Sequence, residues 1–409
     1  MYQEITECRV CASKNLTTVL SLGIQALTGV FPKSKEQTVT SGPVDMVWCE
    51  DCNLVQLKQS YSLSEMYGEN YGYRSGLNAS MVRHLEAKIR ALEVLAQPTH
   101  QDIVIDIGSN DATSLKAYTG GQQRVGIDPT GAKFKEYYTE GIELIPDFFS
   151  AQLFKDKFPG REVKIVTSIA MFYDLERPLD FVRQIYEVLD SDGIWHFEQS
   201  YLPSMLATNS YDTICQEHLE FYSLSVVKNM LERVGFRLLD VQLNDVNGGS
   251  FAVTACKLNA KYTSNAAAID KLLAAEADMK LDTAEPYLAF AERVFAHRKE
   301  LVDLINSLVA SGKKVMGYGA STKGNVLLQF CEFNSKQIRS IAEVNPDKYG
   351  AMTPGTHIGI VSEVDAKAES PDYLLVLPWH FRESILAREV EFLAGGGKFI
   401  FPLPVVEVI

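Results

Sequence analysis

The sequence has fewer basic than acidic residues, and it lacks any long run of apolar residues. Its 409 residues include 39 Lys or Arg against 52 Asp or Glu, a formal net charge of −13. This balance argues against general affinity for nucleic acid or anionic membranes, because phosphate binding rests on clustered cations. No stretch reaches the roughly 18 apolar residues that a membrane span needs. The first ten residues, MYQEITECRV, show no secretory signal. We therefore expect a cytoplasmic protein that binds neither nucleic acid nor membranes.

Cysteine is sparse and odd in number, which argues against a disulfide framework. Four of the seven cysteines form two CxxC pairs, Cys8 with Cys11 and Cys49 with Cys52. Thiolates bind zinc strongly, and two such turns can present four sulfurs to one tetrahedral ion. Two unrelated turns or a single redox dithiol are the alternatives. Because four protein ligands leave no open position for substrate, the zinc site predicted here is structural.

Apolar runs alternate with helical segments through most of the chain, a pattern typical of parallel sheets covered by helices. An amphipathic helix is expected at 78–96 and longer helices at 265–311. The first series of expected strands is 102–108, 124–129, 163–172, 193–200, 236–244 and 250–257, of which the last two form an antiparallel hairpin. A second series is 313–321, 337–348, 372–379 and 398–404.

The chain is therefore predicted to be an α/β protein of three domains. Residues 1–70, which are turn-rich, form the four-cysteine zinc module. Residues 71–257 form a central Rossmann-like domain, and residues 258–409 form a C-terminal Rossmann-like α/β domain.

The loop after the first expected strand of the central domain has the character of a cofactor site. It reads Asp106-Ile107-Gly108-Ser109-Asn110-Asp111, and Asp128 ends the next strand. A carboxylate in the latter position can bind ribose hydroxyls. The loop lacks the GxGxxG pattern that pyrophosphate requires, so its acids suit a cofactor with a cationic centre and an amino group. S-adenosylmethionine has these properties, and an ordinary strand–helix turn is the alternative. The residues assigned to the cofactor are Asp106, Gly108, Asn110, Asp128 and Ser168.

Residues 209–231 are dense in groups that transfer protons: Tyr211, Asp212, Cys215, Glu217, His218, Glu220 and Tyr222. Histidine is the usual general base near neutral pH, and an adjacent carboxylate or phenol can orient it. A polar segment beside a core would contain the same residue types. From the residues alone, the catalytic and structural interpretations are equally supported.

The segment GYGASTKGNVLL, residues 317–328, predicts a tight turn at a helix N-terminus, where backbone amides favour a phosphate. Lys323 adds a mobile positive charge, and a plain strand–helix connection is the alternative. Residues His380 and Arg382 follow a later strand and are expected to reach the same ligand. The residues assigned to substrate binding are Tyr318, Ser321, Lys323, Asn325 and Arg382.

Taken together, DIGSNDATSL, CQEHLEFYSL, GYGASTKGNVLL and the CxxC pairs resemble the sugar C-methyltransferases, in the same order and over essentially the whole chain. The resemblance implies a zinc module, an S-adenosylmethionine-dependent methyltransferase domain and a C-terminal domain that helps hold a sugar nucleotide. Members of this family methylate C3 of dTDP- or GDP-linked 4-keto-6-deoxyhexoses. The resemblance also implies that His218 is the base with Glu217 beside it, and that Tyr73 is an active-site tyrosine.

The sequence departs from the family pattern at three positions. Cys215 stands where many members have tyrosine, Gln216 where histidine is frequent, and Ala112 where the cofactor loop usually has glycine. The first departure leaves the group that supports the enolate oxygen undetermined, whereas alanine still fits a helix start.

The implied chemistry begins at the C4 ketone, which acidifies the proton at C3. We expect His218, positioned by Glu217, to remove this proton, with Tyr73 or Tyr222 hydrogen-bonding the oxyanion. A nicotinamide-dependent oxidoreductase and a non-catalytic, zinc-stabilised binding protein are the competing interpretations. The sequence leaves the nucleotide, the sugar stereochemistry and the oligomeric state undetermined.

Overall fold

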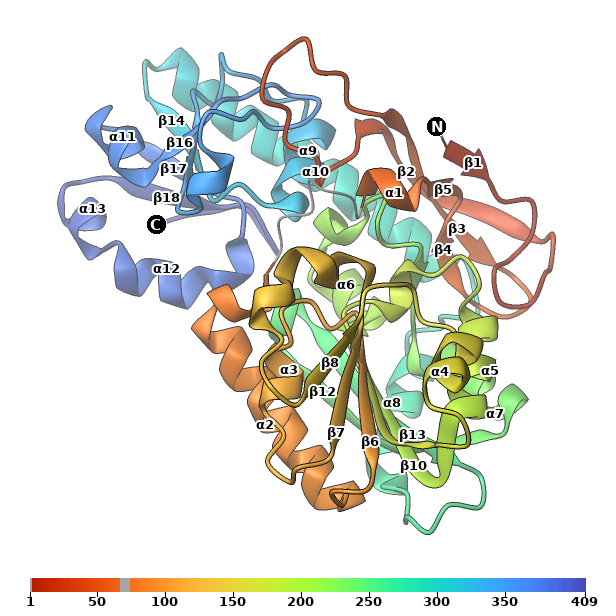
Figure 1. Ribbon diagram of the computed structural model, residues 1–409. Coiled ribbons are helices and arrows are strands. Elements are labelled where there is room, and N and C mark those ends of the chain that lie inside the picture. Colours follow the sequence, from red (N-terminus) through yellow and green to blue (C-terminus); the bar gives the residue numbers. More distant parts are fainter. Residues whose placement is uncertain (1, 67–73) are drawn as a thin grey trace.

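The computed structural model describes residues 2–66 and 74–409 and divides into a small β-rich module and two helix-covered sheets (Figure 1). The N-terminal strands lie at the upper right of that view, the central sheet lies below, and the C-terminal sheet lies at the left. This arrangement confirms the predicted α/β fold class. The predicted domain boundaries at residues 70 and 257 stay predictions.

The central sheet has seven strands in the order β12-β13-β10-β9-β6-β7-β8. Neighbours from β10 to β8 are parallel, whereas β13 is antiparallel to both β10 and β12, which confirms the predicted closing hairpin. The strands are β6 (Ile103–Ile107), β7 (Gln123–Ile127), β8 (Ile142–Ile145), β9 (Val163–Ile169), β10 (Leu189–Ser200), β12 (Phe236–Asn244) and β13 (Ser250–Lys257). The sequence did not predict the four-residue strand β8.

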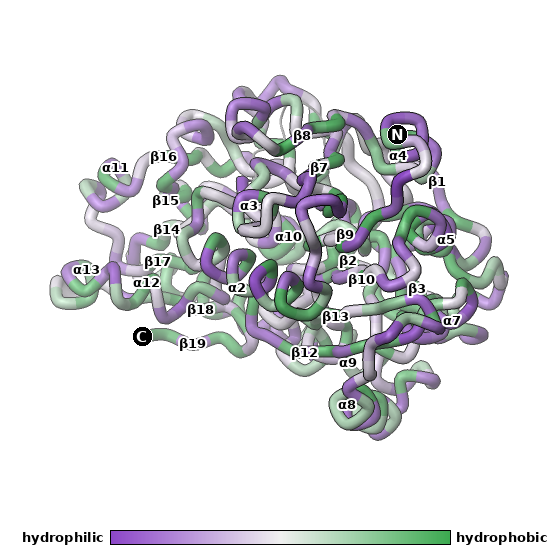
Figure 2. Tube along the Cα trace, turned by 60° about the horizontal axis from the view of Figure 1, so that its bottom comes forward, coloured by the Kyte–Doolittle hydropathy of each residue, from purple (hydrophilic) through white to green (hydrophobic). Residues whose placement is uncertain are grey.

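Helices cover both faces of this sheet, and its inner strand β6 is accordingly buried at every position. Ile105 of β6 belongs to an apolar core with Val182. The preceding residue, Val104, belongs to a separate core with Ile89. Figure 2 shows hydrophilic and hydrophobic residues alternating along the predicted amphipathic helix, α2. The helices are α2 (Ala79–Ala96), α3 (Thr113–Lys116), α4 (Ala151–Lys157), α5 (Pro178–Val188), α6 (Leu202–Ala207), α7 (Leu224–Val234) and α8 (Ala266–Asp278).

The C-terminal sheet repeats the same architecture with six strands in the order β16-β15-β14-β17-β18-β19. All its pairs are parallel except β18 with β19. Its strands are β14 (Val315–Tyr318), β15 (Ile341–Glu343), β16 (Ile360–Ser362), β17 (Tyr373–Val376), β18 (Lys398–Phe401) and β19 (Glu407–Val408). Its helices are α9 (Glu285–Ala310), α10 (Thr322–Phe330), α11 (Glu363–Ala368), α12 (Arg382–Arg388) and α13 (Val390–Ala394).

The N-terminal module contains more regular structure than the sequence predicted. Its strands are β1 (Tyr2–Glu4), β2 (Leu16–Ala26), β3 (Ser41–Cys49), β4 (Val55–Leu57) and β5 (Gln59–Tyr61). The expectation of a turn-rich segment was wrong here, because β2 and β3 are 11 and 9 residues long. A strand from the middle of the chain, β11 (Glu220–Phe221), completes the order β11-β4-β3-β2.

Helix α9 joins the N-terminal module to the C-terminal domain in one core. Its buried Tyr287 and Val294 belong to the same apolar cluster as Met46 of β3 and Val315 of β14. The two parts therefore form one packing unit with the helix between them. Within the described residues, no helix combines the length and the apolar character that crossing a membrane requires.

Candidate active site

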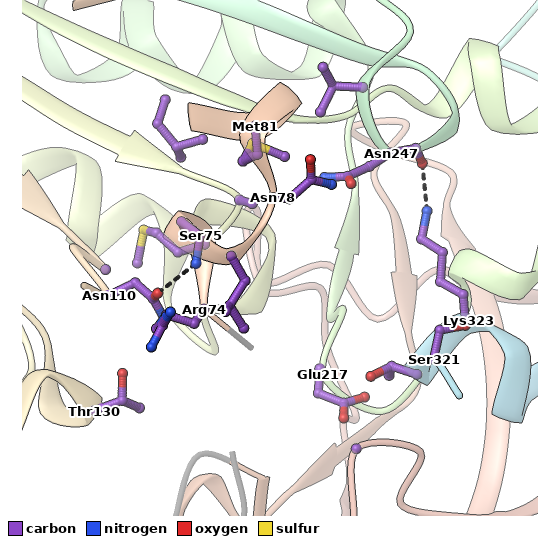
Figure 3. A pocket seen from close by; sticks show the side chains of 18 of the residues that line it. Arg74, Ser75, Asn78, Met81, Asn110, Thr130, Glu217, Asn247, Ser321 and Lys323 are labelled. Carbon is purple, nitrogen blue, oxygen red and sulfur yellow. Dashed lines mark hydrogen bonds between the residues drawn. The ribbon is translucent and has the colours of Figure 1, made fainter. Parts of the chain in front are cut away.

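A cavity of about 1340 Å³ lies where the carboxyl ends of the central and C-terminal sheets face one another. In each sheet the strand order reverses beside one strand, which is β6 in the central sheet and β14 in the C-terminal sheet. Ligands of open α/β sheets bind at such switch points. The N-terminal module contributes Gly29 and Phe31 to the wall. Figure 3 shows Asn110 and Thr130 of the central domain across the cavity from Glu217, Ser321 and Lys323.

Most of the predicted site residues meet in this cavity. Those that line it are Asp106, Gly108, Asn110, Asp128, Glu217, His218, Tyr318, Ser321 and Lys323. Those that do not are Ser168, Tyr222, Asn325 and Arg382. Tyr73 lies outside the described residues.

The cofactor loop is tied to the end of the neighbouring strand β7 by the carboxylate of Asp128. One carboxylate oxygen accepts a hydrogen bond from the Asn110 backbone amide at 2.7 Å, and the other accepts one from the Thr130 backbone amide at 2.7 Å. Gly108 has φ of +73°, a left-handed conformation that glycine adopts without strain. The loop thereby turns its backbone toward the cavity.

Two buried carboxyl groups, Asp106 and Asp128, face the cavity beneath this loop. Burial raises the pKa of Asp106 to about 7, and the neighbouring charge of Asp128 adds to the rise, while a hydrogen bond from Thr167 opposes it. A cationic ligand would reduce the electrostatic repulsion between these two carboxyl groups. S-adenosylmethionine, which carries an ammonium and a sulfonium, fits this pair.

The ring of His218 is oriented by the backbone of the same segment. Its Nδ1 lies 2.7 Å from the carbonyl oxygen of Thr213. Because a carbonyl only accepts, Nδ1 carries the proton in the neutral ring, and Nε2 keeps a free electron pair. Tyr173 packs edge-on with ring centroids 4.4 Å apart. Burial lowers the pKa of His218 to about 4, the charge of Lys323 acts in the same direction, and the Thr213 hydrogen bond opposes both. The imidazole is a neutral base at pH 7.

Glu217 lines the cavity but does not have the positioning role that was expected of it. Its carboxyl accepts a hydrogen bond from the Thr28 hydroxyl at 3.1 Å, and burial raises its pKa. The contact that orients Nδ1 of His218 comes instead from Thr213. The expectation failed because residues 215–218 form a turn, closed by the His218 backbone amide donating to the Cys215 carbonyl at 3.1 Å, in which neighbouring side chains leave the backbone in different directions.

Lys323 reaches from the start of α10 across to the central domain. Its ammonium donates to the carbonyl of Asn247 at 2.6 Å (Figure 3). Burial lowers the pKa of Lys323, and the carboxyl of Asp212 opposes this shift. Its charge also lowers the pKa values of His218 and His380, both of which line the cavity together with Lys323.

Ser168 and Tyr222 are buried in the central core rather than exposed in the cavity. Ser168 accepts a hydrogen bond from the Trp195 indole at 2.9 Å, and the residues after its strand, Ala170 and Met171, reach the cavity instead. Tyr222 is 0% exposed and stacks on Phe172 at 5.2 Å. Neither side chain is placed for the contact that the sequence suggested.

Two residues assigned to substrate binding have structural partners elsewhere. The amide of Asn325 donates to the Thr28 carbonyl at 2.8 Å and so ties α10 to the N-terminal module. Arg382 forms an ion pair at 2.6 Å with Glu407 of the edge strand β19. By contrast, Ser321 caps α10 at the cavity wall, accepting the Gly324 amide at 3.0 Å.

Several groups that shape the site were not found from the sequence. They are the carbonyls of Thr213 and Asn247 and the hydroxyl of Thr28. Two of these three are backbone atoms, which every residue type offers, so no sequence pattern marks them. His380, which lines the cavity, was noted from the sequence but was not among the assigned site residues.

The four predicted metal ligands converge. The sulfur atoms of Cys8, Cys11, Cys49 and Cys52 all lie within 4.8 Å of one another, and the Cys8–Cys52 and Cys11–Cys49 distances are 3.5 Å. Sulfurs around a tetrahedral zinc with bonds of about 2.3 Å are about 3.8 Å apart. Both turns continue into a left-handed residue and carry the same backbone hydrogen bond to their first cysteine. The donor set fits one structural zinc ion.

Comparisons with known proteins agree with this site. Family models match a zinc binding domain at residues 8–67, a methyltransferase domain at 81–241 and a C-methyltransferase C-terminal domain at 245–404. The molecule is thus a zinc-containing, S-adenosylmethionine-dependent methyltransferase. The C-methyltransferase NovU of Streptomyces niveus is 31% identical over 415 residues, which cover 99% of this chain and 97% of NovU. The chain belongs to this C-methyltransferase family. These matches disagree with the oxidoreductase and non-catalytic interpretations.

Solved structures resemble parts of the chain more distantly. The YcgJ protein of Bacillus subtilis is 14% identical, covering 43% of this chain and 98% of its own, with a TM-score of 0.34. The 1,6-didemethyltoxoflavin-N1-methyltransferase of Burkholderia thailandensis is 12% identical, covering 44% of this chain and 78% of its own, with a TM-score of 0.32.

The four-sulfur site predicts about one zinc ion per chain in the purified protein, measured by mass spectrometry of the metal. Cys49→Ala should lower this content and the melting temperature together, because zinc binding contributes to folding. Cys256→Ala removes a buried thiol outside the site and should leave the metal content unchanged. Full zinc content in the Cys49 variant would contradict the assignment.

Proposed function

We propose that this enzyme methylates C3 of a nucleotide-linked 4-keto-6-deoxyhexose through an enolate. The observation that carries the proposal is the place of His218: its ring lines the same cavity as the cofactor loop, with the tautomer set by Thr213. A cavity of about 1340 Å³ exceeds the roughly 300–1,000 Å³ of a site for one small ligand, so it has room for cofactor and sugar nucleotide together.

His218 acts as the general base in this proposal. Nε2 takes the proton from the carbon next to the ketone, and the Thr213 carbonyl, which already accepts Nδ1–H, stabilises the imidazolium that forms. The electron pair of the broken C–H bond moves into the enolate. When bound, S-adenosylmethionine supplies an electrophilic methyl group, which forms a carbon–carbon bond as its bond to sulfur breaks. The cofactor loop positions that donor against the enolate carbon.

Among the described residues, Lys323 is the group to which we assign support of the enolate oxygen. Tyr222 lies outside the cavity lining, whereas the Lys323 ammonium lies in the cavity and its charge acts on His218. The keto oxygen is attached to the carbon adjacent to the one that loses its proton, so a cation near the base is also near the developing oxyanion. The role proposed for Lys323 therefore moves from the diphosphate to the ketone.

We assign the diphosphate to other cations that line the cavity, Lys348 and Lys33. Arg388 also lines the cavity but forms an ion pair with Glu363 at 2.5 Å. Lys348 donates to the Ala320 carbonyl at 2.7 Å, beside the turn that follows β14. Charge-assisted hydrogen bonds of this kind suit phosphate oxygens.

Incubation with dTDP- and GDP-linked 4-keto-6-deoxyhexoses and the methyl donor tests the proposal. Mass spectrometry should show the gain of one methylene, and NMR should place the new methyl group at C3. The C4 ketone acidifies both neighbouring carbons, so a methyl group at C5 would keep the mechanism and correct the position. Absence of product with every 4-keto sugar nucleotide would overturn the substrate class.

Replacing the base should abolish chemistry and spare cofactor binding. His218→Asn should lower kcat by ~10²–10⁴-fold, because proton transfer is lost. The dissociation constant of S-adenosylhomocysteine, measured by calorimetry, should stay near that of the parent enzyme. His100→Asn, at an exposed position, serves as the control. A kcat close to the parent value in the His218 variant would mean that another residue is the base.

The acidic limb of the pH profile should lie unusually low. The base must be neutral, and burial lowers the pKa of His218 to about 4. Activity should therefore persist below the ordinary histidine pKa of about 6.5 and fall only as the pH approaches about 4. Stopped assays of kcat against pH measure the midpoint. A midpoint near the ordinary value would show that the base is more solvated than in this structure.

Removing the Lys323 charge should affect turnover more than affinity. Lys323→Met is expected to lower kcat by ~10²–10³-fold, as loss of one oxyanion partner does. Lys313→Met, on an exposed lysine paired with Asp372, is the control. Steady-state kinetics distinguish a role at the ketone from a role at the diphosphate. A raised KM with unchanged kcat would mean that Lys323 binds the diphosphate.

A further inference from the structure

The segment that carries the base is built into the sheet of the zinc module. Strand β11 begins two residues after His218 and pairs antiparallel with β4, with Glu220 opposite Gln56. Just before this pair, the Leu57 amide donates to the Leu219 carbonyl at 2.8 Å. The base therefore precedes a strand that exists only as an edge of the N-terminal sheet.

Side chains extend this attachment to the residues immediately before the base. The amide of Gln216 donates to the Gln25 carbonyl at 3.1 Å and also to the Ala26 carbonyl, at the end of β2. Glu217 accepts from Thr28, three residues after Gln25. The module thus holds the segment on both sides of His218.

Arg9 connects this attachment to the metal site itself. It lies inside the first CxxC turn, and its side chain is only 3% exposed. Its guanidinium donates to the Leu57 carbonyl at 2.5 Å and to the Ser60 hydroxyl at 2.9 Å. Its Nε is 3.7 Å from a carboxylate oxygen of Glu220, whose side chain is 0% exposed.

The Arg9–Glu220 pair is a strong constraint because both side chains are removed from water. Burial raises the pKa of the Glu220 carboxyl, and the charge of Arg9 opposes this rise most strongly, with a smaller contribution from the Leu175 backbone amide. Loss of one partner from such a buried pair is costly. The second CxxC turn is held to β4 as well, since the Cys49 amide donates to the Leu54 carbonyl at 2.9 Å.

We propose that the zinc module is a positioning element for catalysis, in which the Arg9–Glu220 pair and the β4–β11 pairing transmit the metal-bound geometry to His218. Arg9 and Glu220 are positioning residues and contact no reacting atom. The inference rests on the proposed role of His218. The inference goes further than that role, because it makes turnover depend on the structural metal site.

The test compares Arg9→Met and Glu220→Gln with Lys155→Met, which breaks an exposed ion pair with Glu187 in the central domain. Both positioning variants should lower kcat by about 10²-fold, because a misplacement of about 1 Å costs that much. The dissociation constant of S-adenosylhomocysteine should change less than about twofold. Arg9→Lys keeps the charge and should recover part of the turnover. Lys155→Met should match the parent enzyme.

A second measurement does not depend on turnover. Chelation of zinc from the full-length protein should cause residues 220–221 to lose protection from amide hydrogen exchange, while strand β6 stays protected and S-adenosylhomocysteine still binds. Added zinc should restore the protection. Unchanged exchange at 220–221 in zinc-free protein and in Arg9→Met would overturn the inference. So would a parallel loss of kcat and cofactor affinity, which indicates unfolding.

The two measurements also separate this inference from the proposed function. If His218→Asn keeps its turnover, the assignment of the base fails, while exchange at 220–221 still reports whether the module holds the segment. If exchange responds to zinc but Arg9→Met keeps full kcat, the attachment is structural only and the positioning role is wrong.

Discussion

The chemistry that we propose for this cavity depends on the hydrogen bond between Nδ1 of His218 and the Thr213 carbonyl. A buried imidazole could present either nitrogen to a substrate, and only an unprotonated nitrogen can accept a proton. The carbonyl fixes this choice without adding a second titrating group. The edge-on ring of Tyr173 then limits rotation of the imidazole.

Three parts of the chain must assemble for that nitrogen to face the cavity. The central domain supplies the cofactor loop and the segment of the base, the N-terminal module holds that segment, and the C-terminal domain supplies Lys323. Asn325 and Gln329 of α10 bond to Thr28 and Ala26, so two of these parts also hold each other. The result is a cavity in which the neutral form of His218 is favoured.

Much of this site follows from the sequence because its signals are local. The CxxC spacing predicts both metal turns, and the apolar run before Gly108 predicts strand β6 with its acidic loop. Ser168 shows where such reasoning ends. Strand β9 is covered on both faces, so hydrophobicity does not reveal which way a given side chain points, and Ser168 points to Trp195 in the core.

The predicted roles of Glu217 and Tyr222 were wrong for a related reason. Each lies close to His218 in the chain, yet one side chain bonds to Thr28 and the other stacks on Phe172. Contacts of that kind are decided by which distant strand the segment joins. The pairing of β11 with β4 joins residues more than 160 positions apart in the chain, and no local sequence pattern predicts it.

Solvent exchange tests the central claim most directly, because it observes the proton that we propose His218 removes. The enzyme is incubated in heavy water with S-adenosylhomocysteine and a 4-keto-6-deoxyhexose nucleotide, and NMR follows the hydrogen at the carbon beside the ketone. The account predicts deuterium at C3 with the parent enzyme and none above background with His218→Asn. Equal deuterium incorporation by both proteins would contradict it.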